Sequence, residues 1–150
     1  MMKNQIISGS CHCKAISYHL KTEISLRNLT VRACSCGFCT KTGNRYISDP
    51  HATLVIYWTE SQAHHYQFST KTADFIICKQ CGVLPFVLCQ IDSKFYAVVN
   101  SNTFNKQKQL KLEDIPKLNY DGEPTEDRLA RRRKNWIGKV IFKNIRELEE

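Results

Sequence analysis

Short runs of β-branched and aromatic residues dominate the chain between Ala15 and Ser101. Turn-forming pairs such as Gly43-Asn44, Asp49-Pro50 and Asp92-Ser93 separate these runs. Their length and composition predict strands, and their close succession favours antiparallel sheets over alternating helices and strands. The predicted strands are Ile16–Leu20, Leu29–Arg32, Thr53–Trp58, His65–Phe68, Phe75–Ile77, Leu84–Ile91 and Phe95–Val99. The sequence therefore predicts a mainly β fold.

The pattern changes after Asn100, because Asn102 to Lys117 is polar and rich in lysine. We therefore expect a β domain over residues 1–105 and a C-terminal extension over residues 106–150, packed on the same domain. The last residues, Ile141 to Glu150, are rich in charged side chains and are expected to fray.

A short helix is predicted within the extension, with Thr125 as its N-cap and its end before Gly138. Leu129 and Trp136 lie seven residues apart, so they share one face of this helix. Asp127 stands four residues before Arg131, a spacing that favours an ion pair.

Composition places the chain among ordinary globular domains. It has 150 residues, of which 42% are apolar and 24% are charged, enough for one hydrophobic core. The chain contains no apolar run long enough to span a membrane, and its N-terminus has only Ile6-Ile7 as an apolar pair. We therefore expect no membrane insertion and no secretion, and we predict a cytoplasmic protein.

Eight cysteines are the most informative feature of the composition. Disulfides are rare in the cytoplasm, so thiols at this density point to metal binding. A disulfide framework is the less favoured alternative, because nothing in the sequence indicates export. The formal charge of +8 counts every thiol as neutral, and thiolates bound to zinc would lower it.

Seven of the cysteines fall into three short segments. These are Cys11-His12-Cys13, Cys34-Ser35-Cys36-Gly37-Phe38-Cys39 and Cys78-Lys79-Gln80-Cys81-Gly82. Two closely spaced cysteine pairs that meet in space make a tetrahedral zinc site. The partner of the third segment is either the first segment or two cysteines of the middle one. Joining the first and third segments closes one site and leaves three sulfurs in one loop. The eighth, Cys89, is expected to be a small buried residue on a strand.

Three protein ligands leave a fourth position on zinc for water or a substrate atom. The middle segment is therefore a candidate reactive site. The alternative is a second closed structural site, with a fourth ligand from a histidine. The histidines considered are His12, His51, His64 and His65.

The cysteine segments, together with Gly9-Ser10, Arg32-Ala33, Thr42-Gly43 and Gly82, resemble the motifs of the glutathione-dependent formaldehyde-activating enzyme family. This family, also called the centromere protein V/GFA domain family, includes the domain of centromere protein V. The resemblance covers roughly residues 5 to 105, with all seven cysteines in the same order and spacing. The segment from Tyr120 to Gly138 is similar to the tail of bacterial members.

The resemblance implies an Mss4-like fold (a β-tent) of antiparallel sheets with two zinc ions per chain. It implies that Cys11, Cys13, Cys78 and Cys81 hold a structural zinc, and that Cys34, Cys36 and Cys39 hold a catalytic and labile one. The implied activity is the synthesis of S-(hydroxymethyl)glutathione from glutathione and formaldehyde. In reverse, this reaction is that of a carbon–sulfur lyase.

A thiol substrate such as glutathione also needs partners for its carboxylates. Arg32, Lys41 and Arg45 flank the three-cysteine segment and are candidates for this role. The alternative is that they are ordinary surface cations.

Two further functions remain open at this stage. Arg128 to Lys134 contains five cations in seven residues, which could bind nucleic acid in a zinc-stabilised binding module without catalysis. Acidic residues in the same region favour a solvated helix instead. The third possibility is a thiol- or zinc-handling protein that uses the three-cysteine loop to exchange metal or sense oxidants.

Overall fold

The computed structural model describes residues 5–106, 110, 113 and 115–148. Its strands form two sheets, one with the order β1-β2-β5-β11 and one with the order β10-β3-β4-β9-β8-β7-β6. The first sheet contains β1 (Gln5–Ser10), β2 (Ser17–Thr22), β5 (Thr53–Trp58) and β11 (Lys139–Asn144). The second contains β3 (Val31–Cys34), β4 (Arg45–Ile47), β6 (Ala63–Tyr66), β7 (Asp74–Cys78), β8 (Phe86–Ile91), β9 (Lys94–Asn100) and β10 (Lys117–Leu118).

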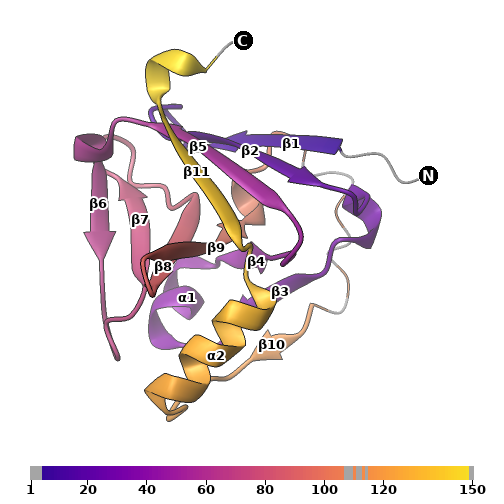
Figure 1. Ribbon diagram of the computed structural model, residues 1–150, viewed down its shortest axis with the longest axis vertical. Coiled ribbons are helices and arrows are strands. Elements are labelled where there is room, and N and C mark those ends of the chain that lie inside the picture. Colours follow the sequence, from indigo (N-terminus) through magenta and orange to yellow (C-terminus); the bar gives the residue numbers. More distant parts are fainter. Residues whose placement is uncertain (1–4, 107–109, 111–112, 114, 149–150) are drawn as a thin grey trace.

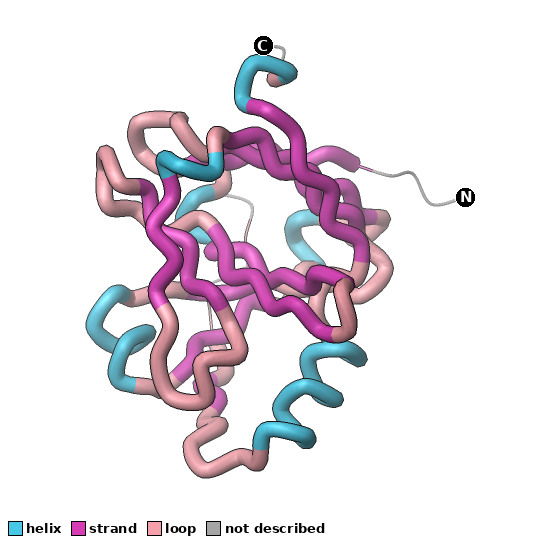
Figure 2. The backbone as a smooth tube through the Cα atoms, turned by 60° about the vertical axis from the view of Figure 1, so that its left-hand side comes forward, coloured by secondary structure: helices cyan, strands magenta, loops and turns pink. Residues whose placement is uncertain are grey.

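Two α-helices and several 3-10 turns complete the described chain. They are α1 (Gly37–Thr42), α2 (Thr125–Asn135), η1 (Leu26–Asn28), η2 (Glu60–Gln62), η3 (Ser101–Thr103) and η5 (Ile145–Glu147). Figure 1 shows the first sheet at the top and α2 with β10 at the opposite end, below the strands of the second sheet. The tube view in Figure 2 shows the same separation of α2 from the first sheet. None of the described helices has the length and apolar character of a membrane span.

The second sheet is buried on both faces in its centre, which explains the unbroken apolar run of β8. Phe86 and Leu88 point into the core shared with the first sheet, whereas Val87 and Cys89 point into a second core. This alternation is the period of two that every strand imposes. Trp136, which directly follows α2, closes the second core from the other side. The prediction that Cys89 is a buried strand residue is confirmed.

Most pairings in both sheets are antiparallel, so the predicted mainly β fold of antiparallel sheets is confirmed. The β8–β9 hairpin turns at Asp92 and Ser93, which have φ angles of 50° and 67°. Positive φ at both positions is the geometry of a two-residue turn that matches the twist of the strands. The pairing of Phe86 with Val99 then follows from this register.

The expectation that the chain frays from Ile141 onwards is wrong for the part that the structure describes. Lys139 to Asn144 form β11, which runs parallel to β5 along its whole length. Phe142 stacks on Trp58 with ring centroids 5.7 Å apart, so one aromatic side chain covers another at the edge of the sheet. Residues 149–150 lie outside the described residues, as does part of the polar segment 102–117. Strands β1, β4 and β10 were not predicted either.

Helix α2 forms where it was predicted, but two of its details differ. Pro124 is the N-cap residue and makes no capping hydrogen bond, so Thr125 is the first helical residue. Arg131 pairs with Glu123 rather than with Asp127, because the loop before the helix folds back along it. Beyond the helix, Ile137 exchanges backbone hydrogen bonds with Ala97 of β9, which directs the chain into β11.

Gly9 gives a test of the packing around Tyr18, its partner on the neighbouring strand β2. A methyl group there would overlap the Tyr18 ring, which is fully buried and whose hydroxyl lies 2.7 Å from the hydroxyl of Thr103. We expect Gly9→Ala to lower the free energy of unfolding by about 1–3 kcal/mol, the usual cost of overpacking. Denaturant-induced unfolding of the zinc-loaded protein measures this change.

Gly37→Ala is the matched control, because an added methyl group at Gly37 meets no atom within 4 Å and Gly37 is the first residue of α1. This change is expected to be neutral or slightly stabilising. Equal stability of Gly9→Ala and the wild-type protein would contradict the described packing.

Candidate metal centres and the adjoining cavity

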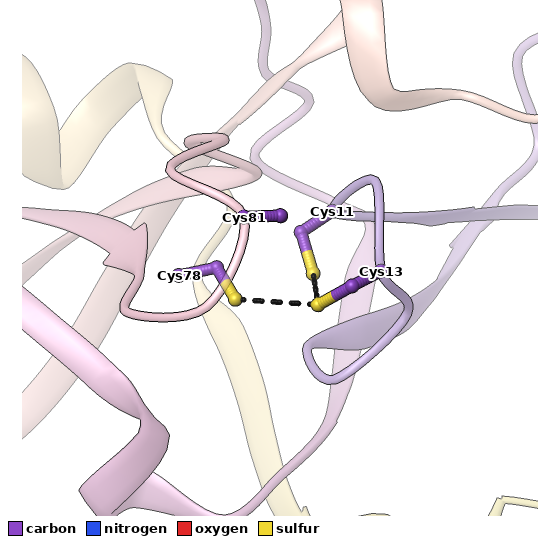
Figure 3. Close-up of side chains that lie close together, drawn as sticks. All are labelled: Cys11, Cys13, Cys78 and Cys81. Atoms are coloured by element: carbon purple, nitrogen blue, oxygen red, sulfur yellow. Dashed lines mark hydrogen bonds between the residues drawn. The ribbon is translucent and has the colours of Figure 1, made fainter.

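Four cysteines from two loops that are distant in the sequence meet beside the core that the two sheets share. Cys11 and Cys13 lie in the connection between β1 and β2, whereas Cys78 ends β7 and Cys81 lies in the turn that follows. Figure 3 shows the two loops facing each other, with the four side chains pointing inward. All four sulfurs lie within 4.8 Å of one another. We call this set the four-cysteine cluster.

The spacing of these sulfurs fits a tetrahedral zinc ion. Zinc–sulfur bonds of about 2.3 Å place the sulfurs of a tetrahedral site about 3.8 Å apart. The Sγ atoms of Cys11 and Cys13 are 3.8 Å apart, and those of Cys13 and Cys78 are 3.5 Å apart. The donor set is therefore a closed one, with no ligand position left for a substrate.

A tight turn holds the second pair of this cluster in place. Gly82 has a φ angle of 80°, and its N–H donates a 2.9 Å hydrogen bond to the carbonyl of Cys78. The N–H of Gln80 points at the sulfur of Cys78 from 3.4 Å. On the opposite loop, the N–H of Ile16 donates to the sulfur of Cys11 over the same distance. Such N–H donors stabilise thiolates and orient them.

Without a cation the four sulfurs differ in their protonation. Burial raises the pKa of Cys11 to about 12. Burial also opposes ionisation of Cys81, but hydrogen bonds from the backbone of Cys13 and Val83 and from the thiols of Cys78 and Cys11 together outweigh it and lower the pKa of Cys81 to about 6. Four thiolates this close together repel one another, so a bound cation is what would make all of them ionise.

The remaining three clustered cysteines lie at the opposite side of the second sheet. Cys34 ends β3, Cys36 is the N-cap of α1 and Cys39 lies within that helix. Their sulfurs also lie within 4.8 Å of one another. The N–H of Cys39 donates to the sulfur of Cys36 over 3.4 Å, as a capping side chain requires. We call this set the three-cysteine cluster.

No histidine or carboxylate of the described residues completes the three-cysteine cluster. None of the four histidines considered as a fourth ligand joins it. The structure therefore separates the seven cysteines into a set of four and a set of three, which matches the more economical of the two groupings left open by the sequence. A zinc ion held by the second set would keep one position for another ligand.

Within this cluster a hydrogen bond between two thiols separates their pKa values. A hydrogen bond from Cys39 lowers the pKa of Cys34 to about 6. The same hydrogen bond, in which Cys39 keeps its proton, raises the pKa of Cys39. Cys34 is thus the sulfur that ionises first, and the cluster presents a thiolate at neutral pH even without metal.

A chain of buried hydrogen bonds supports Cys39. The hydroxyl oxygen of Tyr46 lies 3.3 Å from the sulfur of Cys39 and accepts a 3.0 Å hydrogen bond from the amide of Asn44. Asn44 in turn accepts a 3.1 Å hydrogen bond from the amide of Asn100. Because Asn44 donates to Tyr46, the hydroxyl proton of Tyr46 is free to point at the sulfur. Second-sphere donors of this kind tune and orient metal ligands.

A cavity of about 160 Å³ opens beside the three-cysteine cluster. Its walls include all three cysteines, aromatic side chains of the second core and one face of α2. Four arginines line it, whereas Asp121 is its one acidic lining residue among those described. The arginines are Arg32, Arg128, Arg131 and Arg132. The cavity is therefore apolar at its base and positively charged on one side.

The three cations predicted from sequence have different positions. Arg32 lines the cavity, but Lys41 and Arg45 do not. Lys41 is exposed on α1, and the Nε of Arg45 donates a 2.8 Å hydrogen bond to Asn102. The cavity thus gives no support to the prediction that Lys41 or Arg45 binds a carboxylate of the substrate.

The arginines that α2 contributes to the cavity were not among the predicted substrate-binding residues. A signal for one of them was present, because Arg132 lies three residues after Leu129 and four before Trp136, on the apolar face of the helix. The basic segment Arg128 to Lys134 is accordingly divided. Arg128, Arg131 and Arg132 face the cavity, and Arg133 reaches Asp92 over 3.5 Å at the surface.

The chain is similar to a known protein family and to a solved structure. The model of a family described as glutathione-dependent formaldehyde-activating enzyme matches residues 6–115. A crystal structure of a Rhodobacter sphaeroides protein superposes with a TM-score of 0.60 and 22% sequence identity, covering 74% of this chain and 99% of that one. No curated protein matches the chain.

The hydrogen bond to Cys39 gives a test of the three-cysteine cluster. We expect Tyr46→Phe to weaken zinc binding at this cluster by about 10- to 100-fold, the usual cost of losing a second-sphere partner. Competition with a chromogenic chelator measures the two zinc affinities separately, and the affinity of the four-cysteine cluster is expected to stay unchanged.

Tyr96→Phe is the matched control. Tyr96 is also buried in the second core, and its hydroxyl bonds to neither cysteine cluster among the described residues. If the zinc affinity of the three-cysteine cluster were the same in Tyr46→Phe, in Tyr96→Phe and in the wild-type protein, Tyr46 would have no part in metal binding.

Proposed function

The chain belongs to the glutathione-dependent formaldehyde-activating enzyme family, and we propose that it is a zinc-dependent carbon–sulfur lyase that also runs in the direction of synthesis. Membership and the mainly antiparallel sheets together confirm the Mss4-like fold expected from the sequence. The substrates that we assign are glutathione and formaldehyde, or a related small thiol and aldehyde. The observation that carries the proposal is the three-cysteine cluster, which lacks a fourth ligand among the described residues and lines a cavity.

The two clusters divide the roles expected of two zinc ions. Cys11, Cys13, Cys78 and Cys81 supply four sulfurs and would hold a structural ion that ties the first sheet to the second. Cys34, Cys36 and Cys39 would hold the reactive one. A zinc ion there supplies a positive charge that lowers the pKa of a thiol and keeps it as a nucleophilic thiolate at neutral pH.

The reaction itself needs no oxidant or reductant. The sulfur of the thiol forms a bond to the carbonyl carbon of formaldehyde, and the carbonyl π bond breaks. The proton of the thiol ends on the former carbonyl oxygen, which gives a hemithioacetal. In the lyase direction the carbon–sulfur bond breaks and the proton returns to sulfur.

The chain contributes mainly by holding the thiol. Formaldehyde is too small to need a recognition pocket, so selectivity depends on the rest of the thiol substrate. The aromatic walls of the cavity, such as Phe68 and Phe75, pack against Phe38 of α1 and exclude water from that side. A cavity of about 160 Å³ is smaller than the ~300 Å³ of pockets that enclose a drug-sized ligand. It would therefore hold the sulfur end of a peptide thiol, or the whole of a smaller one.

Zinc content and turnover can be measured on the same samples. We expect about two zinc ions per wild-type chain and faster exchange between glutathione plus formaldehyde and their adduct than in protein-free buffer. Cys36→Ser removes one of three ligands, so it is expected to lower the zinc content towards one and to abolish the acceleration. Elemental analysis and exchange NMR are the two readouts.

Cys89→Ser is the matched control, because Cys89 is buried but belongs to neither cluster. It should keep both zinc ions and the acceleration. Two zinc ions without any acceleration in the wild-type protein would leave the metal sites in place and contradict the proposed reaction. A thiol- or zinc-handling protein or a zinc-stabilised binding module would then be the better account.

A further inference from the structure

Arg132 is a buried cation without an anionic partner. Its side chain belongs to α2, and only 7% of the residue is exposed. Its Nη1 donates to the hydroxyl of Thr72 over 2.9 Å and to the sulfur of Cys89 over 3.5 Å. Its Nε is fully buried and donates to no acceptor among the described residues. No ion pair to Arg132 is present in the described part of the chain either.

The other arginines of α2 already have partners. Arg131 donates to the carboxylate of Glu123 over 3.0 Å and lies over the Tyr120 ring, 3.5 Å from its centroid. Arg128 donates to the carbonyl oxygens of Tyr120 and Glu123. Glu123 is thus used by the neighbours of Arg132, and its carboxylate does not form an ion pair with Arg132 itself.

An unpaired buried guanidinium is costly to maintain. Burial lowers the pKa of Arg132, but a guanidinium stays protonated in proteins, so its charge persists. A charged group that is buried in a protein needs a counter-charge or a full set of hydrogen bonds. The Trp136 ring, whose centroid lies 5.0 Å from the guanidinium carbon, adds a cation–π contact but no hydrogen-bond acceptor or full negative charge. The hydroxyl of Thr72 and the sulfur of Cys89 supply only part of the hydrogen bonds. An anion bound in the cavity would supply the rest.

Arg132 and the three-cysteine cluster line the same cavity, from α2 on one side and from β3 and α1 on the other. We propose that Arg132 binds a carboxylate of the thiol substrate while the substrate's sulfur lies at Cys34, Cys36 and Cys39. This inference rests on the proposed function, because it assumes a thiol substrate, and it adds that the substrate is an anionic thiol.

The position of Arg132 in the chain gives this inference a further consequence. The family model ends at residue 115, whereas α2 begins at Thr125. The group that selects the substrate therefore lies outside the part of the chain that defines the family. The cysteines set the chemistry of the site, and α2 sets which thiol enters it.

A matched pair of ligands tests the selection. The probes are 3-mercaptopropionate and its methyl ester, which share the thiol and differ in the carboxylate. Calorimetric titration of the two-zinc protein gives the ratio of their affinities. In the wild-type protein we expect the acid to bind more tightly than the ester by roughly ten- to hundredfold, the strength of a hydrogen bond to a charged group.

The variants assign this preference to one residue. Arg132→Gln is expected to reduce the ratio of affinities to about one, while Arg132→Lys, which keeps the charge, is expected to keep part of it. Arg133→Gln is the matched control on the same helix, because the Arg133 side chain is 48% exposed and pairs with Asp92. A ratio that is the same in Arg132→Gln and in the wild-type protein would overturn the proposal.

A measurement on the wild-type protein covers the case in which Arg132→Gln does not fold. The Nε–H resonance of Arg132, assigned through Arg132→Lys, should shift on titration with 3-mercaptopropionate and stay in place with the ester. An unmoved resonance at saturation with the acid would contradict the proposal. The protein could bind the acid more tightly than the ester and yet accelerate the reaction of no thiol with formaldehyde. That result would contradict the proposed reaction and still support the role of Arg132 in binding a carboxylate.

Discussion

Negative charge on closely spaced sulfurs is the constraint on which both sites depend. Sulfurs within 4.8 Å of one another cannot all be thiolates unless a cation neutralises them. The fold supplies backbone N–H groups that favour ionisation of some sulfurs, such as Cys81, and burial that disfavours it at others, such as Cys11. A divalent ion resolves this conflict in both clusters, so metal binding and the folded arrangement of the loops depend on each other.

The two sheets determine which cysteines meet. The connection after β1 faces the turn after β7 because the first sheet packs on the second through residues such as Tyr18 and Phe86, whose rings are 6.3 Å apart. The middle cysteine segment begins at the end of β3, on the far side of the second sheet, where α2 covers the second core. A closed site within the body and an open one beside a cavity thus follow from one sheet that is buried on both faces.

Much of this architecture could be predicted from the sequence. The strand Thr53–Trp58 was predicted at its observed bounds, because a continuous run of apolar residues is typical of a central strand. Strand β11 could not be predicted, since its lysines and exposed positions are typical of a surface segment and its partner, β5, lies about 85 residues earlier. The short strand β4 has three residues, too few to show a period.

The residues of the candidate site also fall into two groups, those that could be predicted from the sequence and those that could not. Cysteine spacing is local, so the seven ligands could be grouped from sequence, whereas the cations of the cavity depend on tertiary packing. Arg45 is near the cysteines in sequence but bonds to Asn102, and Arg132 is nearly 100 residues away yet shares their cavity. Only its position on the apolar face of α2 marked Arg132 in advance.

One cluster is closed by four sulfurs, whereas the other has three sulfurs and an open position. Zinc K-edge X-ray absorption on the two-zinc protein distinguishes this arrangement from two closed sites. We expect a mean of about 3.5 sulfurs per zinc without thiol, rising to about 4 when 3-mercaptopropionate is added. Four sulfurs per zinc before any thiol is added, or a mean that does not rise with it, would show that the three-cysteine cluster has no open position for a thiol.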